Sequence, residues 1–140
     1  MQILYTASAT TTGGRNGHGK SEDGVLDVRF AVPKAMGGPG TPGSTTPEDL
    51  FAAGYAACFG SALEFVGRQH KKVLKQIEVT ARVSIGKREE GGFGLATELD
   101  VRLPELSRSD AEDLVAEAHK VCPYSNATRG NMEVKLSVLD

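Results

Sequence analysis

Apolar and polar residues alternate with a period of two in four runs of the chain, a pattern that is typical of half-buried strands. The runs are residues 25–32, 77–85, 95–103 and 132–138. The second and third runs flank the turn sequence Glu89–Gly92, so they predict a hairpin. The β-tolerant residues 2–10 predict one further strand, and the Gly-rich residues 13–19 and 33–46 predict loops.

A helical pattern begins after Thr46. Thr46 is suited to the N-cap, Pro47 favours the first helical position, and the carboxylates of Glu48 and Asp49 complement the positive end of the helix dipole. The apolar stretch that follows predicts a long, mostly buried helix to about His70.

A second helical pattern follows the hairpin, with Ser107 or Ser109 at its N-cap and three apolar residues facing inward. The inward residues are Leu114, Val115 and Ala118. The predicted order is ββαββαβ, which indicates an α+β fold with antiparallel sheets and two helices. No internal repeat or domain boundary interrupts residues 1–140, so we expect a single domain.

The composition is that of an ordinary globular domain, with 39% apolar and 24% charged residues. The net charge is −2 and no basic cluster is larger than His70–Lys72, which argues against nucleic acid or an acidic membrane as a partner. The sequence starts without a basic leader, and no apolar run approaches the ~18 residues of a transmembrane helix. We therefore expect a cytoplasmic protein, in which two cysteines are more often free or catalytic than permanently bridged.

Several short motifs match known sites but lack the context that those sites need. Gly14–Ser21 satisfies the phosphate-loop pattern, yet acidic residues and a strand follow it where a helix is required. Asn126–Thr128 fits a glycosylation sequon, but without a secretory signal a capping turn is the better interpretation. The three histidines lie in separate segments without metal-ligand spacing, and no serine sits in a G-x-S-x-G elbow. We therefore expect no metal and no cofactor, and the thiols remain as the candidate chemistry.

The two cysteines, Cys58 and Cys122, each have a plain structural interpretation beside the catalytic one. A free cysteine often behaves as a small buried hydrophobe. A reactive pair needs no metal, because a sulfenic acid on one cysteine condenses with the other to form a disulfide. Cys122 precedes Pro123 at the negative end of a predicted helix, which disfavours a thiolate and fits the resolving role.

A thiolate at Cys58 needs a cation from another segment. No Lys or Arg occurs between Pro47 and Gly67, and burial raises the pKa of a thiol. Arg15 is the best candidate, because it is always charged and its neighbouring glycines allow the backbone to approach another element closely. Lys20 and Arg129 stay open as alternatives.

Helical spacing gathers apolar residues in one stripe around Cys58. They are Phe51, Gly54, Ala62 and Phe65, with Tyr55 and Ser61 at the edges. The stripe is either plain core or a wall of an apolar pocket at the thiol. In the second case Phe51, Tyr55 and Phe65 bind the apolar tail of a substrate.

Two longer motifs carry a family resemblance. The runs TPEDLFAAGYAACFGSAL and VCPYSNATRGN, with a Gly-rich loop that contains Arg15, resemble the organic hydroperoxide resistance (Ohr) branch of the OsmC/Ohr family. The resemblance covers nearly the whole chain and implies a homodimer of interleaved chains. It also implies that Arg15 is the catalytic arginine and that Glu48 is the carboxylate that orients it.

The resemblance implies a thiol-dependent peroxidase that reduces organic hydroperoxides to alcohols. Cys58 attacks and becomes a sulfenic acid, Cys122 closes a disulfide with it, and an external dithiol, a lipoyl group on a carrier protein, reopens the disulfide. No metal, flavin or haem is needed. Two alternatives stay open: an OsmC-type relative with other substrates, and a non-enzymatic redox sensor whose disulfide alters a partner interface.

Helix geometry sets one condition on this site. Ten residues separate Glu48 from Cys58, and at ~1.5 Å per residue an unbroken helix places them about 15 Å apart. Either the helix breaks near Gly54, or Glu48 acts on the site of a second subunit. The interleaved dimer of the family favours the second arrangement.

Overall fold

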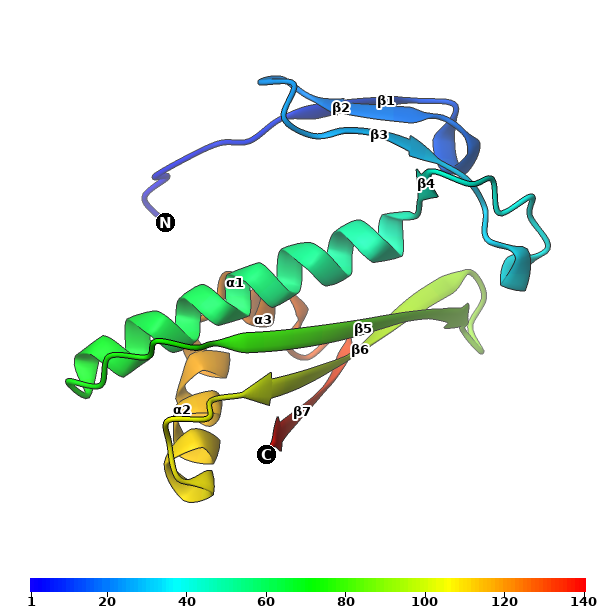
Figure 1. The fold of residues 1–140 in the computed structure, drawn as a ribbon. Helices are drawn as coiled ribbons and strands as arrows, with labels where there is room; N and C mark the ends of the chain where they lie inside the picture. The colour runs from blue at the N-terminus through cyan, green and yellow to red at the C-terminus, as the bar shows by residue number, and fades with distance from the viewer. The chain divides into compact units, whose positions relative to one another are not determined.

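The structure is a computed structural model that describes all 140 residues. It divides into two compact units, residues 1–50 and residues 51–140 (Figure 1). The first unit holds a four-stranded sheet and the second a three-stranded sheet with its helices. The mixed α+β class predicted from the sequence is confirmed. The prediction of one domain over residues 1–140 stays a prediction.

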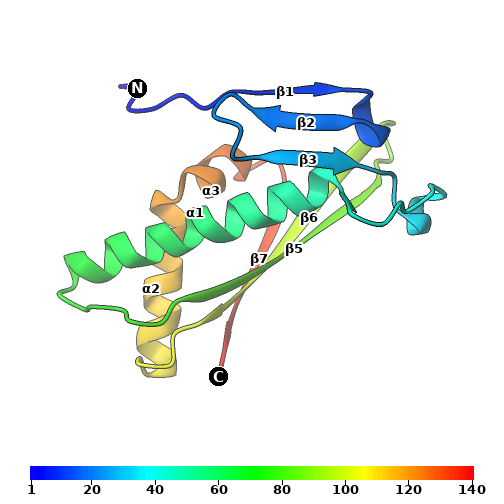
Figure 2. The ribbon, with the colours of Figure 1, turned by 45° about the horizontal axis from the view of Figure 1, so that its top comes forward.

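The sheet of the first unit has the order β1-β2-β3-β4. Its strands are β1 (Ala9–Thr12), β2 (His18–Ser21), β3 (Asp27–Phe30) and β4 (Ser44–Thr45), and two short 3₁₀ turns are η1 (Gly14–Asn16) and η2 (Lys34–Met36). The first three strands lie side by side in Figure 2 and pair antiparallel, and β4 pairs parallel to β3. The predicted strand over residues 2–10 is wrong in its extent, because β1 begins at Ala9.

Strand β2 was not predicted from the sequence, because the glycines of residues 13–19 suggested a loop. A side chain at Gly19 would place its Cβ 2.8 Å from a ring carbon of Phe30, so the glycine makes room for a packed aromatic within the sheet. Lys20 and Ser21 end this strand and begin no helix, so the phosphate-loop match has no structural basis.

The long helix α1 (Pro47–Gln69) starts where the sequence predicts. Thr46 Oγ1 accepts from the Asp49 amide at 3.1 Å, and Asp49 Oδ2 accepts from the Thr46 amide at 3.2 Å, which is a reciprocal capping box. The expectation of a mostly buried helix is wrong, since one face is buried while residues such as Ala53 and Phe65 are exposed.

By length and composition α1 is apolar enough to cross a membrane, with a mean hydropathy of 1.4, contrary to the sequence expectation. Its buried face nevertheless belongs to the core of the second unit. Tyr55, Phe59, Leu63 and Val66 pack there against the inner face of the sheet. Core helices of globular proteins have the same composition.

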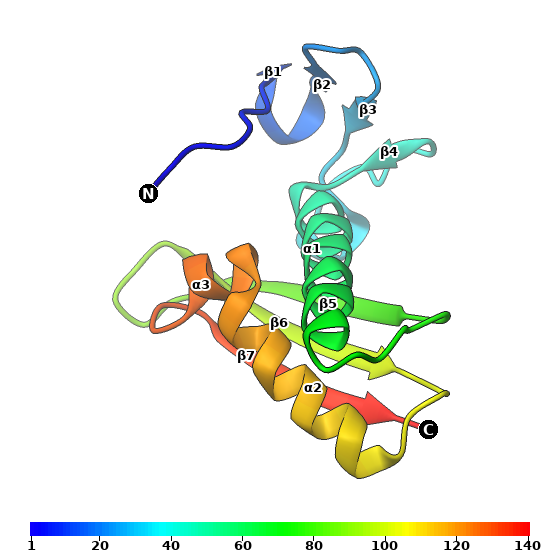
Figure 3. The same cartoon turned by 90° about the vertical axis from the view of Figure 1, so that its left-hand side faces the viewer.

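The sheet of the second unit consists of β5 (Glu78–Lys87), β6 (Phe93–Arg102) and β7 (Glu133–Leu139), in that order. The predicted hairpin of β5 and β6 is confirmed, with Gly91 and Gly92 at positive φ in its turn. Helix α2 (Arg108–Val121), capped by Ser107, and helix α3 (Pro123–Thr128) lead from β6 to β7. Figure 3 shows α1, α2 and α3 gathered beside this sheet.

Three further details of the prediction are wrong. Strand β7 pairs parallel to β6, because the α2–α3 connection is a crossover rather than a hairpin. A third helix, α3, follows Pro123, which we expected to end the helical region. Proline ends one helix and also favours the first position of the next, so its local signal has two interpretations. The sequon Asn126–Thr128 lies inside α3 rather than in a capping turn.

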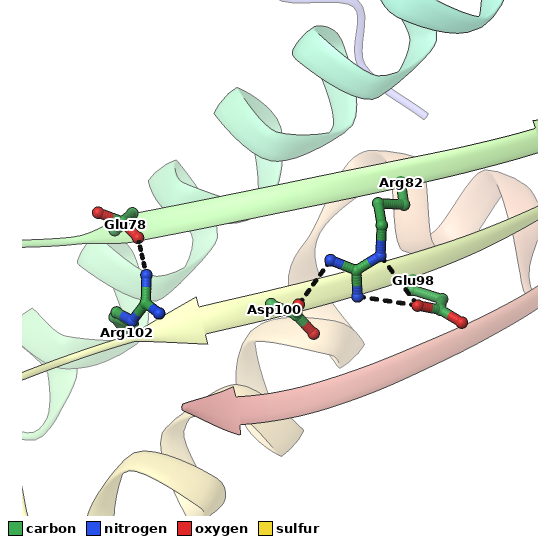
Figure 4. Close-up of polar contacts among 5 residues, drawn as sticks. All are labelled: Glu78, Arg82, Glu98, Asp100 and Arg102. Carbon is green, nitrogen blue, oxygen red and sulfur yellow. Dashed lines mark hydrogen bonds and ion pairs between the residues drawn. The ribbon is translucent and has the colours of Figure 1, made fainter. Parts of the chain in front are cut away.

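The outer face of the second sheet carries a row of ion pairs (Figure 4). Arg82 contacts Glu98 at 2.8 Å and Asp100 at 2.7 Å, and Arg102 contacts Glu78 at 2.6 Å. Arg82 and Glu98 are direct cross-strand partners, as are Arg102 and Glu78. These pairs favour the observed register of β5 and β6, which leaves the opposite face of the sheet for the core.

Candidate active site

Cys58 and Cys122 meet in the second unit. The Cys122 thiol lies 3.6 Å from Cys58 Sγ, and both cysteines are free. A disulfide requires about 2.05 Å, so the sulfurs are neighbours that are not bonded. Cys122 is fully buried, whereas Cys58 is partly exposed and is therefore the more accessible thiol.

The surroundings of Cys58 oppose its ionisation. Burial is the main cause that raises the pKa of this thiol above its ordinary value of 9.0, and the nearby Cys122 raises it further. The backbone N–H of Tyr124 acts in the other direction and lowers this pKa, because an N–H close to the sulfur stabilises the thiolate. Sequence reasoning missed this donor. Its signal is Pro123, which starts a helix whose first amides lack partners within the helix.

Cys122 lies at the junction of two helices. Its N–H donates to Ala118 O at the end of α2, and its C=O accepts from the Asn126 N–H at the start of α3, both at 2.9 Å. Cys122 therefore lies between two helices rather than at the end of the helical region. The dipole argument against a Cys122 thiolate is also weakened, because the residue borders the positive end of α3 as well as the negative end of α2.

Arg15 and Glu48 meet in the first unit. The two terminal nitrogens of Arg15 donate to the two carboxylate oxygens of Glu48 at 2.9 and 2.6 Å, a bidentate pair. Arg15 lowers the pKa of Glu48, so this carboxylate is ionised at neutral pH. Both residues belong to the same chain, and Glu48 is in the first turn of α1.

Glycines shape the loop that carries Arg15. Gly13 and Gly14 have φ of 77° and 58°, in the left-handed region that other residues avoid. A Cβ at Gly17 would lie 1.6 Å from the carbonyl oxygen of Thr12, so no side chain fits there. The loop therefore holds η1 tightly between β1 and β2 and presents Arg15 toward Glu48.

The alternative cations have other positions. Arg129 donates to Asn126 Oδ1 at 2.8 Å and to the carbonyl oxygen of His119, so it joins α2 to α3. Lys20 lies on β2, opposite Asp27 of β3. Arg15 is thus the candidate cation whose partner is a carboxylate at the start of the helix that carries Cys58.

The predicted pocket residues have different surroundings. Tyr55 has no exposed surface and is part of the core, whereas the ring of Phe65 is 54% exposed. Phe51 lies between them in exposure, and its ring centroid is 6.1 Å from that of Tyr55 and 5.8 Å from that of Tyr124.

Phe51 lines a cavity of about 440 Å³ in the second unit. Phe93, Leu95 and Met132 supply further apolar lining, and Arg88, Thr128 and Asn131 supply polar groups. The Phe51 ring also packs near that of Tyr124, a residue in the first turn of α3. No group of three or more His, Cys, Asp or Glu side chains is gathered as a metal site requires.

Three comparisons with known proteins agree with one another. The family model for OsmC-like protein matches residues 38–137. An organic hydroperoxide resistance protein of Xanthomonas axonopodis pv. citri is 47% identical over 98% of this chain and 96% of its own length. The organic hydroperoxide resistance protein OhrB of Bacillus subtilis is 48% identical over 96% of this chain and 98% of its own length.

Solved structures give the same result for the fold. The crystal structure of an organic hydroperoxide resistance protein from Elizabethkingia anophelis has a TM-score of 0.93 and 53% identity, and the match covers 100% of this chain and 99% of that one. A protein from Vibrio cholerae has a TM-score of 0.93 and 48% identity, and the match covers 99% of this chain and 94% of that one. Its structure is described as that of a possible organic hydroperoxide resistance protein with captopril bound in one of the active sites.

Proposed function

The chain belongs to the OsmC/Ohr family, and we propose that it is an organic hydroperoxide reductase that works through Cys58 and Cys122. The observation that carries the proposal is the 3.6 Å contact between a partly exposed thiol and a buried one. The names of the relatives, which are organic hydroperoxide resistance proteins, support the substrate class.

The proposed reaction begins with the Cys58 thiolate. Its sulfur attacks the distal oxygen of the hydroperoxide, the O–O bond breaks, and the alkoxide leaves as an alcohol after it takes a proton. Cys58 is then a sulfenic acid. The Cys122 sulfur attacks Cys58 in turn, water leaves, and an external dithiol reduces the resulting disulfide. We propose a lipoyl group on a carrier protein as this reductant, and a cytoplasmic location for the reaction.

Arg15 and Glu48 supply the electrostatic part of the proposal. Cys58 is desolvated, and the one basic residue of its helix, Arg68, lies ten residues away and pairs with Glu64, so the thiolate needs a charge from elsewhere. A bidentate partner fixes the orientation of the Arg15 guanidinium, which is then preorganised for the thiolate and for the leaving oxygen.

We propose that this charge comes from a second copy of the chain. Helix α1 runs without a break from Pro47 to Gln69, so Glu48 and Cys58 are about 15 Å apart along its axis. One guanidinium does not bridge that span. A homodimer in which the Arg15–Glu48 pair of one copy faces Cys58 of the other supplies the missing cation.

The cavity at Phe51 is the proposed site for the apolar tail of the substrate. Its volume of about 440 Å³ and its lining by Phe93, Leu95 and Met132 suit a bulky hydrocarbon group. Phe65, on the exposed face of α1, stays a predicted contact. An OsmC-type relative with other substrates would show the same thiol chemistry and a different preference among hydroperoxides.

One measurement tests the proposal directly. The reduced protein is mixed with one equivalent of cumene hydroperoxide and its intact mass is measured. We expect the loss of two hydrogen atoms as the disulfide forms, and turnover when a dithiol such as dihydrolipoamide is added. A disulfide that forms without turnover would favour the redox sensor. A mass that does not change would contradict both functions.

A further inference from the structure

The hydroxyl of Ser125 joins three helices at one point beside the thiols. Ser125 Oγ on α3 lies 2.9 Å from the Tyr55 hydroxyl on α1 and 2.8 Å from His119 Nδ1 on α2. Ser125 and Tyr55 have no exposed surface. We call these three residues the Ser125 node. A hydroxyl donates once and accepts twice, so Ser125 can hold both partners at the same time.

The Ser125 node lies one helical turn from each sulfur. Tyr55 precedes Cys58 by three residues on α1, and Ser125 follows Cys122 by three residues at the start of α3. Polar contacts therefore connect α1 to α3. The Tyr55 hydroxyl bonds Ser125 Oγ and lies 3.5 Å from Thr128 Oγ1. The Tyr124 N–H lowers the pKa of Cys58.

The same node also connects α3 to α2. His119 is in the last turn of α2, and its ring reaches Ser125 while its carbonyl accepts from Arg129. The junction that carries Cys122 is thus tied on both sides. Burial is the main cause that lowers the pKa of His119 below its ordinary 6.5, with Arg129 as the second cause, so the ring is neutral at pH 7. A neutral node is less costly to bury than a charged one.

The Tyr124 and Tyr55 contacts respond differently to the first reaction step. A thiolate is a strong acceptor for the Tyr124 N–H, but peroxide attack converts it into a neutral S–OH whose sulfur accepts poorly. The Tyr55–Ser125 bond involves no reacting atom and is unaffected. After the first step it still joins α1 to α3, together with the longer 3.5 Å contact of the Tyr55 hydroxyl with Thr128 Oγ1.

We propose that Tyr55, Ser125 and His119 are positioning residues for disulfide closure, because they hold the Cys122 junction against α1 while Cys58 is a sulfenic acid. The inference rests on the proposed function. In the step that they serve, the Cys122 sulfur attacks the Cys58 sulfur and the S–O bond breaks. Hydroxide leaves with the Cys122 proton as water, and the S–S distance falls from 3.6 Å to about 2.05 Å.

The variant Tyr55→Phe tests the node, because it deletes one oxygen and leaves Ser125 with its His119 partner. Rapid-quench mass spectrometry with cumene hydroperoxide follows sulfenic acid formation and disulfide closure separately. We expect the first step at the wild-type rate and closure slowed roughly three- to tenfold, the effect of one hydrogen bond. Slower closure also leaves more Cys58 as sulfinic acid when peroxide is in excess. Tyr5→Phe, the same change at an exposed residue, is the matched control and should behave as wild type.

Ser125→Ala is the second variant, and it removes both hydrogen bonds of the node. We expect it to slow closure more than Tyr55→Phe does. Closure at the wild-type rate in a folded Tyr55→Phe or Ser125→Ala protein overturns the inference, and so does equal slowing of both steps. A wild-type protein in which Cys58 forms no sulfenic acid would instead contradict the proposed function, and the inference with it.

Discussion

Glu48, the partner of Arg15, and Cys58 lie ten residues apart on one unbroken helix, so their backbone positions are about 15 Å apart along the helix axis. The break near Gly54 that the sequence left open is wrong. Gly54 is helical, and a Cβ there would lie 2.8 Å from the Tyr124 hydroxyl oxygen. The glycine makes room for a ring and introduces no kink, which leaves the second subunit as the proposed source of the charge.

Mixing two inactive variants tests this arrangement. We expect that Arg15→Ala and Cys58→Ser proteins, unfolded together and refolded, regain peroxidase activity, because a mixed dimer has one site with Arg15, Glu48 and Cys58 intact. The control mixes Arg15→Ala with Glu48→Ala. It should regain none, because Arg15 and Glu48 pair within one chain. Mixed dimers of the first kind that stay inactive would show that Arg15 serves its own chain.

The pH dependence of the first step reports the charge at Cys58. The thiolate exists above the thiol pKa, which burial raises above 9.0 in the absence of an outside cation. Loss of Arg15 should therefore move the rise of the rate to higher pH, and at pH 7 we expect Arg15→Ala to react on the order of 100-fold more slowly. Arg15→Lys should recover little, because an ammonium lacks the planar fork that binds Glu48. Stopped-flow rates between pH 6 and 10 test both variants, and an unchanged profile would remove Arg15 from the mechanism.

The two thiols should differ when each is replaced by serine. Cys58→Ser is expected to abolish peroxide consumption, because the partly exposed nucleophile is lost. Cys122→Ser should still consume one equivalent of peroxide and leave Cys58 as a sulfenic acid, or as a sulfinic acid in excess peroxide. Mass spectrometry of each variant after one and ten equivalents distinguishes the products. Identical behaviour of the two proteins would contradict the assigned roles.

The cavity at Phe51 predicts a preference among peroxides. Each buried methylene contributes up to about 0.8 kcal/mol, so cumene hydroperoxide should have a higher kcat/KM than hydrogen peroxide. Phe51→Ala is expected to lower kcat/KM for cumene hydroperoxide roughly tenfold and to leave hydrogen peroxide nearly unchanged. Val73→Ala, at an exposed residue outside the cavity, is the control. Equal losses on both peroxides would argue against this tail site.

The features that the sequence predicted correctly depend on local signals. The N-cap at Thr46, the start of α1 and the β5–β6 hairpin all follow from residues within a few positions of one another. The missed features depend on distant ones. Gly19 belongs to a strand because Phe30 packs over it, and β7 is parallel because of the path that α2 and α3 take.

The residues of the candidate site show the same difference between local signals and contacts with distant residues. The thiols and Arg15 were predicted from sequence chemistry and family motifs, whereas the Tyr124 amide and the Ser125 node were not. Tyr55 and Ser125 are 70 residues apart, so no pattern in either segment indicates their hydrogen bond. Tyr55 was expected at a substrate pocket because its spacing from Cys58 marks a face of α1. Spacing does not show that α3 covers that face.

His119 predicts a loss of stability in mild acid. The folded protein disfavours protonation of this ring, chiefly through burial and secondly through Arg129, so its folded pKa lies below the ordinary 6.5. The unfolded chain takes up the proton first as the pH falls, and the stabilisation present above about pH 6.5 is therefore lost between that pH and the lower folded pKa. Melting temperatures of wild type and His119→Gln at pH 8 and pH 5 test this point. We expect the drop in Tm from pH 8 to pH 5 to be smaller in His119→Gln, and an equal drop would show that another group is responsible.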